Sequence, residues 1–191
     1  MTVPAVNETE LVTRAQSGDR NAFSELVRIH AQGVMNVIYR MCGDARIAED
    51  AAQETFIQAW LHLSSYRPQT SLRSWLYRIA VNAATDMLRR ERRILPNALE
   101  DLQLQDPQPG PEALFLQEER TALVKKAILS LPEASRVVLV LREYEGMSYY
   151  EIAEALDIPV GTVMSRLNYA RKSLKDKLEQ KLFVQVEAGH V

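Results

Sequence analysis

The chain has 191 residues, enough for one domain or two small ones, and its hydrophobic content of 47% is ordinary for a globular protein. Its formal net charge of −2 excludes a uniformly basic nucleic-acid-binding protein but allows local basic faces. Cys42 is the only cysteine, so no intramolecular disulfide can form and a reducing compartment is expected.

The start of the chain has no basic segment followed by an apolar one, as a secretory leader would. The longest aliphatic run, residues 137–141, is far too short to cross a bilayer. We therefore expect a soluble cytoplasmic protein with no direct membrane insertion.

Apolar residues recur at steps of three and four in nearly every periodic segment, and no segment alternates over the length of a strand. This pattern predicts an all-α protein. In the first half it indicates helices over residues 7–16, 23–41 and 47–63, separated by two Gly-Asp pairs. His30 lies on the apolar side of the second helix without a cluster of partner residues, so we expect a core-edge histidine and not a metal ligand.

The third of these helices has apolar residues on two sides. Alanines form most of one stripe, whereas Ile57 and Leu61 lie among carboxylates on the opposite side. An apolar strip with a polar rim is typical of a helix that docks into a partner's groove. A helix buried on both sides of a bundle would give the same pattern, so both interpretations stay open. The outer side consists of Asp50, Glu54, Ile57 and Leu61, flanked by Gln53 and Trp60.

Residues 64–93 form a basic stretch, in which seven arginines face only two acids and give a local charge of +5. The arginines are interleaved with Tyr66, Trp75 and Tyr77. Cations that follow phosphates, together with rings that stack on unpaired bases, suit a single-stranded nucleic acid. An amphipathic core helix with a solvated arginine face is the alternative. Asn82 and Asp86, four residues apart, are expected either to bond to each other or to read base edges.

From residue 94 to residue 111 the periodicity stops, and prolines stand among acids and glutamines. This composition predicts a flexible acidic linker. Helical spacing resumes after it and indicates helices over residues 123–131 and 134–144. The chain is thus expected to form two helical domains.

The last two predicted helices fit a helix-turn-helix. Ser148 and Glu151 form a capping box that opens the first, and after a tight turn the second begins at Thr162. Short polar residues followed by cations on its outer side suit a helix in the major groove. A helical hairpin for protein contacts is the alternative. The outer residues are Ser165, Asn168, Tyr169 and Lys172, flanked by Thr162 and Arg166.

The sequence gives no sign of catalysis. It contains no glycine-rich phosphate-binding motif, and its three histidines and Cys42 lack the spacing of metal ligands. No Ser/His/Asp set can be proposed from the order of residues. We therefore predict no enzymatic activity, no metal and no cofactor.

Three segments resemble a known family: AEDAAQETFIQAW (48–60), SLRSWLYRIAVNAATD (71–86) and LPEASRVVLVLREYEGMSYYEIAEALDIPVGTVMSRL (131–167). They closely resemble bacterial sigma factors of the extracytoplasmic-function (ECF) group in the sigma-70 family, and the match covers nearly the whole chain. The resemblance implies sigma region 2 at residues 7–93 and sigma region 4 at residues 112–182. The linker then lies at 94–111 and a tail at 183–191.

The resemblance also implies a function. The chain would be a dissociable sigma subunit, whose region 2 binds the clamp helices of the β′ subunit and melts the −10 promoter element. Region 4 would read the −35 element. The partners implied are core RNA polymerase (its β′ clamp helices and β subunit), promoter DNA and an anti-sigma factor, since family members are commonly held by one.

Carried over residue by residue, the resemblance implies three contact sets. The set for core polymerase is Asp50, Gln53, Glu54, Ile57 and Trp60. The set for the −10 element is Tyr66, Ser71, Trp75, Arg78, Asn82, Arg89 and Arg90. The set for the −35 element is Arg142, Tyr149, Thr162, Ser165, Arg166, Tyr169, Arg171 and Lys172.

The chain departs from the family pattern at several positions. Met164 stands where the family usually has Arg or Lys, so one phosphate contact is expected to be missing. Tyr150 stands where Glu is common, and residues 68–71 differ from the common loop, which leaves the −10 base preference open. The alternative functions are a stand-alone helix-turn-helix regulator and an adaptor that uses both domains for protein contacts.

Overall fold

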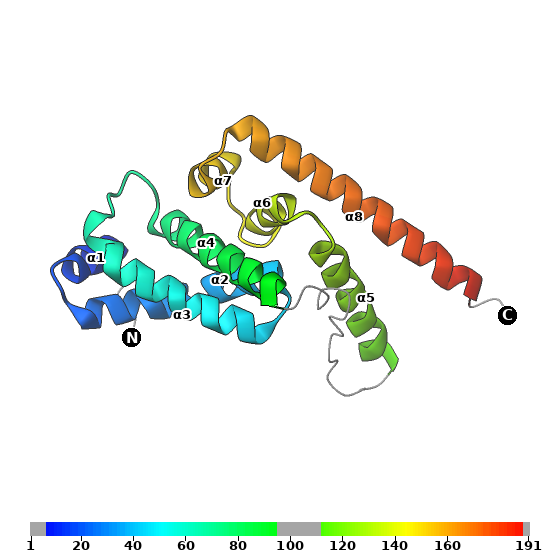
Figure 1. Cartoon of the computed structure of the whole chain (residues 1–191), viewed down its shortest axis with the longest axis horizontal. Helices are drawn as coiled ribbons and strands as arrows, with labels where there is room; N and C mark the ends of the chain where they lie inside the picture. The colour runs from blue at the N-terminus through cyan, green and yellow to red at the C-terminus, as the bar shows by residue number, and fades with distance from the viewer. Residues whose placement is uncertain (1–6, 95–111, 189–191) are drawn as a thin grey trace, which may run out of the picture.

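The computed structural model describes residues 7–94 and 112–188, and within these ranges it contains helices and no strand (Figure 1). The all-α prediction is thus confirmed. Of the linker predicted over residues 94–111, only Ile94 is described, as the last residue of a helix. The elements are α1 (Glu8–Gln16), α2 (Arg20–Cys42), α3 (Ala45–His62), the 3-10 turn η1 (Leu63–Ser65), α4 (Leu72–Ile94), α5 (Glu112–Leu129), α6 (Glu133–Glu143), α7 (Tyr149–Leu156) and α8 (Val160–Ala188).

The first module consists of α1 to α4. Helices α2, α3 and α4 each pack against the other two, and α1 packs on α2. The Gly-Asp pairs act at the helix ends: Gly43 ends α2 with a left-handed φ of 77°, and Asp19 and Asp44 accept backbone N–H groups at the starts of α2 and α3. His30 lies at the edge of this core with Nε2 2.6 Å from Glu8 Oε1, which confirms the core-edge position expected for it.

The second module consists of α5 to α8, with α5, α6 and α7 all packed on α8. The predicted capping box is present, because Ser148 Oγ accepts the Glu151 N–H and the Glu151 carboxylate accepts the Ser148 N–H. Asp157 then adopts the left-handed region (φ 54°) and turns the chain tightly into α8. The helix-turn-helix is therefore formed by α7 and α8.

Both ends of α8 differ from the prediction. The helix begins at Val160 and not at Thr162, because the carbonyl of Pro159 already accepts the N–H groups of Thr162 and Val163. It continues to Ala188, so residues 183–188, predicted as a tail, are helical. No Gly or Pro follows Gly161 until residue 189, which explains why the helix does not end earlier.

The two modules pack on each other. Helix α2 contacts α5 and α6, and α4 contacts α7, as the view of the whole chain also shows (Figure 1). Residues 137–141 of α6 are all buried, whereas a helix with one apolar face would expose at least one of them. The reason is that α6 lies between α2 and α8, so the core runs without a break through both modules.

A buried arginine joins the modules at the end of α2. Arg136 of α6, only 7% exposed, donates hydrogen bonds to the carbonyl oxygens of Met41 and Leu131. Its positive charge therefore lies at the C-terminal end of α2, where the helix dipole is negative. Gly43 lies beside this junction, and a Cβ there would be 2.5 Å from Leu129 Cδ1 of α5.

We predict that Gly43→Ala destabilises the protein by about 1–2 kcal/mol, because alanine is strained at positive φ and its Cβ would displace Leu129. Urea unfolding followed by circular dichroism measures the loss. Gly161→Ala is the matched control, since its Cβ meets open space in a helix, and it should leave stability unchanged or raise it. Equal stability of the two variants would contradict the prediction.

Candidate nucleic-acid interface

The outer face of α3 is open. Ile57 and Leu61 are 47% and 62% exposed, and Asp50 and Gln53 beside them are also exposed. The inner face is made of buried alanines and Thr55, whose hydroxyl donates to the Ala51 carbonyl within the helix. In this structure α3 is therefore not buried on both sides, and its outer face has the character of a docking surface.

Trp60 does not belong to that open face. Its ring packs against Phe23 of α2, with centroids 4.9 Å apart, so it holds α3 onto α2. Glu54 is half-buried and accepts a hydrogen bond from the Gln58 side chain at 2.7 Å. Of the five residues predicted to bind core polymerase, Trp60 is thus placed to support the surface and not to form its centre.

Helices α3 and α4 enclose a groove of about 670 Å³. Glu54, from the first predicted contact set, and Asn82 and Arg90, from the second, line the same groove. Asp86 also lines it and accepts from Arg89 at 3.3 Å, so in this structure it is bonded to Arg89 and not to Asn82. The groove could not be predicted from the sequence, because its two walls belong to different helices and form it only when α3 and α4 pack together.

Tyr66 is part of the core. It is 6% exposed, its hydroxyl donates to the Thr70 carbonyl at 2.7 Å, and its ring lies 5.2 Å from that of Trp75. Burial accordingly raises its pKa. Tyr66, which was predicted to contact the −10 element, is thus buried in this structure, and its hydroxyl is bonded to the loop that follows it. Ser71 is exposed, and its Oγ accepts the Ser74 N–H as an N-cap serine does.

The other residues predicted to contact the −10 element lie along the accessible side of α4. Arg78, Asn82, Arg89 and Arg90 are exposed and Trp75 is half-buried. Their spacing of three, four and seven residues places most of them on one side of the helix. Arg78 is ion-paired with Asp157 of the second module, with Nη2 3.3 Å from Oδ2.

The outer face of α8 matches its prediction. Ser165, Tyr169 and Lys172 are exposed, and Thr162 and Arg166 are half-buried beside them. Val163, Leu167 and Ala170 on the other side are buried against α6 and α7. Met164 is 48% exposed, which gives this polar face one apolar position near its N-terminal end.

The remaining three residues predicted for the −35 element have partners inside the module. Arg142 donates to the Met147 carbonyl at 2.7 Å and lies over the ring of Tyr149. Arg171 pairs with Glu143 at 2.6 Å, a hydrogen bond that raises the arginine's pKa. All three therefore brace α6, α7 and α8 against each other.

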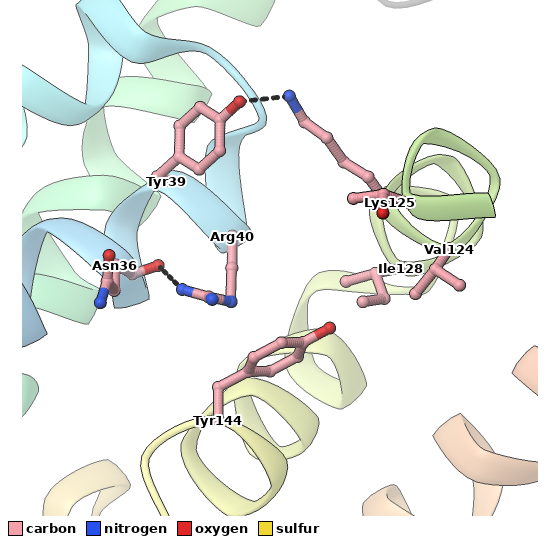
Figure 2. Close-up of a pocket in the computed structure, with 8 residues that line it drawn as sticks. Asn36, Tyr39, Arg40, Val124, Lys125, Ile128 and Tyr144 are labelled. Atoms are coloured by element: carbon pink, nitrogen blue, oxygen red, sulfur yellow. Dashed lines mark hydrogen bonds between the residues drawn. The ribbon is translucent and has the colours of Figure 1, made fainter. Parts of the chain in front are cut away.

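A cleft of about 600 Å³ lies between α2, α5 and α6 (Figure 2). Its walls are largely apolar, and two cations lie on aromatic rings: Arg40 over Tyr144 at 4.1 Å and Lys125 over Tyr39 at 4.4 Å. No pattern in the sequence predicts this cleft, because its two sides come from different modules. The other lining residues are Asn36, Thr121, Val124 and Ile128.

Within the described ranges, no group of three or more histidine, cysteine or acidic side chains is placed to hold a metal ion. None of the described helices combines the length and apolar character that a bilayer crossing requires.

The sequence matches two family models, "Sigma-70 region 2" over residues 26–94 and "Sigma-70, region 4" over residues 121–174. It is 37% identical to the RNA polymerase sigma-H factor of Pseudomonas aeruginosa, over 90% of this chain and 94% of that protein. It is 38% identical to the ECF RNA polymerase sigma-E factor of Escherichia coli K12, over 88% and 93% of the two chains. A solved structure of CnrH in complex with the cytosolic domain of CnrY matches with a TM-score of 0.69 at 28% identity, covering 91% of this chain and 97% of that chain.

We predict that Tyr66→Ala destabilises the protein by about 3–5 kcal/mol, because it removes a buried aromatic ring. Tyr66→Phe should cost about 1 kcal/mol, for the lost hydrogen bond to Thr70. Chemical unfolding measures both. Tyr150→Ala, at an exposed position, is the control and should change stability by less than about 0.5 kcal/mol. If Tyr66→Ala unfolds like this control, the ring is not part of the core.

Proposed function

Because the chain belongs to the ECF group of the sigma-70 family and is a dissociable sigma subunit for transcription initiation, we propose that its two modules divide promoter recognition between them. In this proposal residues 7–93 act as region 2 and residues 112–182 as region 4. The observation that carries it is the similarity to RNA polymerase sigma factors over 88–90% of the chain, together with the two family matches in order. We place its action in the cytoplasm, where polymerase works, and assign it no catalytic step.

The outer face of α3 is the proposed contact for core polymerase. Exposed Ile57 and Leu61 supply an apolar strip, and Asp50, Gln53 and Glu54 supply its polar rim. This combination suits a helix-to-helix contact whose apolar centre is shielded by polar groups at the edge.

The accessible side of α4 is the proposed surface for the melted strand. Opening a duplex loses stacking of about 1.4 kcal/mol per base-pair step. Half-exposed Trp75 offers a ring on which a base can stack, at roughly 1–3 kcal/mol per base, and Arg78, Arg89 and Arg90 offer charge for the phosphates. Asn82, in the groove beside them, has the side chain to bond a base edge. Ser71 caps this helix, and buried Tyr66 fixes the loop that precedes it.

The outer face of α8 is the proposed reader of the −35 element. Thr162, Ser165, Arg166, Tyr169 and Lys172 are accessible near the start of the helix, where a recognition helix meets base edges. Arg142, Tyr149 and Arg171 hold this helix in position through their contacts within the module. Phosphate contacts would position the module and base contacts would specify the sequence.

The cleft between the modules is the proposed site for an inhibitory protein, an anti-sigma factor. The structurally similar CnrH was solved with a bound polypeptide, the cytosolic domain of CnrY. Apolar walls with Arg40 and Lys125 at the edge suit an amphipathic helix whose apolar side carries flanking carboxylates (Figure 2).

Run-off transcription with sigma-free bacterial core polymerase tests the proposal as a whole. A specific transcript that depends on both promoter elements is expected. Binding to duplex promoter DNA without polymerase, combined with no specific transcript, would favour the stand-alone regulator instead. Absence of a transcript from any genomic template would overturn the proposal.

We predict that Ile57→Asp reduces binding to core polymerase more than tenfold, because it places a charge in the apolar strip of α3. Co-purification with tagged core enzyme and a titration of binding measure this. Ile29→Asp is the matched control, an equally large isoleucine that is 42% exposed on α2, and it should bind normally. Normal binding of Ile57→Asp would mean that α3 does not form the contact.

We predict that Met164 contacts the C5-methyl group of a thymine in the −35 element, since an apolar side chain can read only that group in the major groove. Replacing −35 thymines by deoxyuridine should then weaken promoter binding by the holoenzyme about fivefold at one position, and Met164→Ala should abolish the difference. Thymines outside the element serve as the control. A methyl effect that persists in Met164→Ala would contradict this role.

A further inference from the structure

The turn before α7 and helix α7 itself are strongly acidic. Residues 143–157 contain five carboxylates and no lysine or arginine. This acidic segment includes the first helix of the helix-turn-helix, a helix that crosses the phosphate backbone in DNA-bound motifs of this kind. Its carboxylates would repel the phosphates of DNA, so this segment is electrostatically better suited to contact a basic surface. The partner in this structure is α4, which lies in the basic stretch of net charge +5 and packs against α7 (Figure 1).

The closest contact joins Tyr77 of α4 to Glu145 of the acidic segment. The tyrosine hydroxyl donates to the carboxylate at 2.5 Å, and the tyrosine is only 3% exposed. Burial, followed by the hydrogen bond to the carboxylate, raises the pKa of Tyr77. A Cβ on Gly33 of α2 would lie 2.6 Å from the same hydroxyl oxygen. Helices α2 and α4 and the α6–α7 turn therefore meet closely at this point.

Two arginines of α4 extend the contact on either side. Arg73 donates to the Glu145 carbonyl at 3.3 Å and lies 3.6 Å from the carboxylate of Glu151. Arg78 lies 3.3 Å from the carboxylate of Asp157. The Glu151 carboxylate stays ionised, because its hydrogen bonds to Ser148 lower its pKa. The cations of the first half of α4 are thus paired with acids of the other module.

We propose that the acidic segment is an intramolecular occupant of the nucleic-acid surface of α4, and that in the free chain its carboxylates take the place of strand phosphates. This inference rests on the proposed role of α4 in binding the melted strand. Arg78 is the decisive residue, because its guanidinium is both a proposed phosphate contact and the partner of Asp157. The closed chain therefore withholds Arg78 from the strand, and full engagement of the strand requires the acidic segment to leave α4.

The polar contacts between the acidic segment and α4 are weak enough for the segment to dissociate. Both side chains of the Arg78–Asp157 pair are at least half exposed, so this pair is weak and screened by salt. Among the polar contacts of the acidic segment with α4, the Tyr77–Glu145 hydrogen bond is better shielded and contributes the most. Closure should accordingly loosen at high ionic strength. The cleft of Figure 2 depends on the same closure, because its wall residue Tyr144 directly precedes Glu145.

The test uses the full chain without polymerase. The double variant Glu145→Ala/Asp157→Asn removes two carboxylates at the contact, and asparagine tolerates the left-handed backbone of residue 157. The control Asp176→Asn/Glu179→Ala makes the same change of net charge at exposed positions of α8. Small-angle X-ray scattering reports closure through the radius of gyration, and fluorescence anisotropy with a labelled oligo(dT) strand reports access to α4.

We expect the contact variant to have a larger radius of gyration than the control and to bind oligo(dT) about tenfold more tightly. Wild type should expand toward the variant at high salt. If contact variant and control have the same radius and the same affinity, the inference is wrong. A larger radius without tighter binding would equally overturn it, because the segment would then close the chain without occupying the strand surface.

A double-mutant cycle gives a further check. Arg78→Gln and Asp157→Asn should each expand the chain, and the double variant should expand no further than either single variant, because both remove the same pair. Additive expansion in the double variant would count against the pair. These measurements are separate from the test of the proposed function. The contact variant should still direct transcription with core polymerase. If the wild-type protein directs no transcription, the sigma role is rejected, but closure of the chain can still be measured by scattering.

Discussion

Helix α6 packs against α2 on one side and α8 on the other, and the relation between the two modules depends on this double contact. Five consecutive aliphatic residues are buried because both sides of the helix are covered. Arg136 adds a directional bond, since its guanidinium reaches the last turn of α2. Apolar burial supplies most of the adhesion, and the buried charge fixes where α2 ends against α6.

The same packing determines which surfaces are free. It leaves the outer faces of α3 and α8 open, so the proposed polymerase contact and the proposed duplex contact are both accessible in the closed chain. It brings α7 against α4 and pairs the first arginines of α4 with acids. Binding to polymerase and binding to duplex DNA are therefore both possible in the closed chain. The closed arrangement opposes only the proposed capture of the melted strand by α4.

Local features could be predicted from the sequence because they depend on neighbouring residues. The Gly-Asp ends of α2, the capping box of α7 and the outer residues of α8 all follow from spacing within one or two turns. The burial of Tyr66 and the packing of Trp60 could not be predicted, because an aromatic residue at the edge of a pattern can face either way. The contacts with Trp75 and Phe23 decide the direction, and these come from distant turns or another helix. The cleft and the pairing of Arg78 could not be foreseen, because they join segments on opposite sides of the linker.

Burial of α6 on both sides also limits how long an open chain can persist. When the modules part, the aliphatic residues that met α2 face water, and the carbonyls at the end of α2 lose Arg136. An exposed apolar surface of this kind promotes proteolysis and aggregation unless a partner protein covers it. The pool of active molecules in the cell would then be set by turnover as well as by synthesis, with polymerase-bound copies outliving those that open alone.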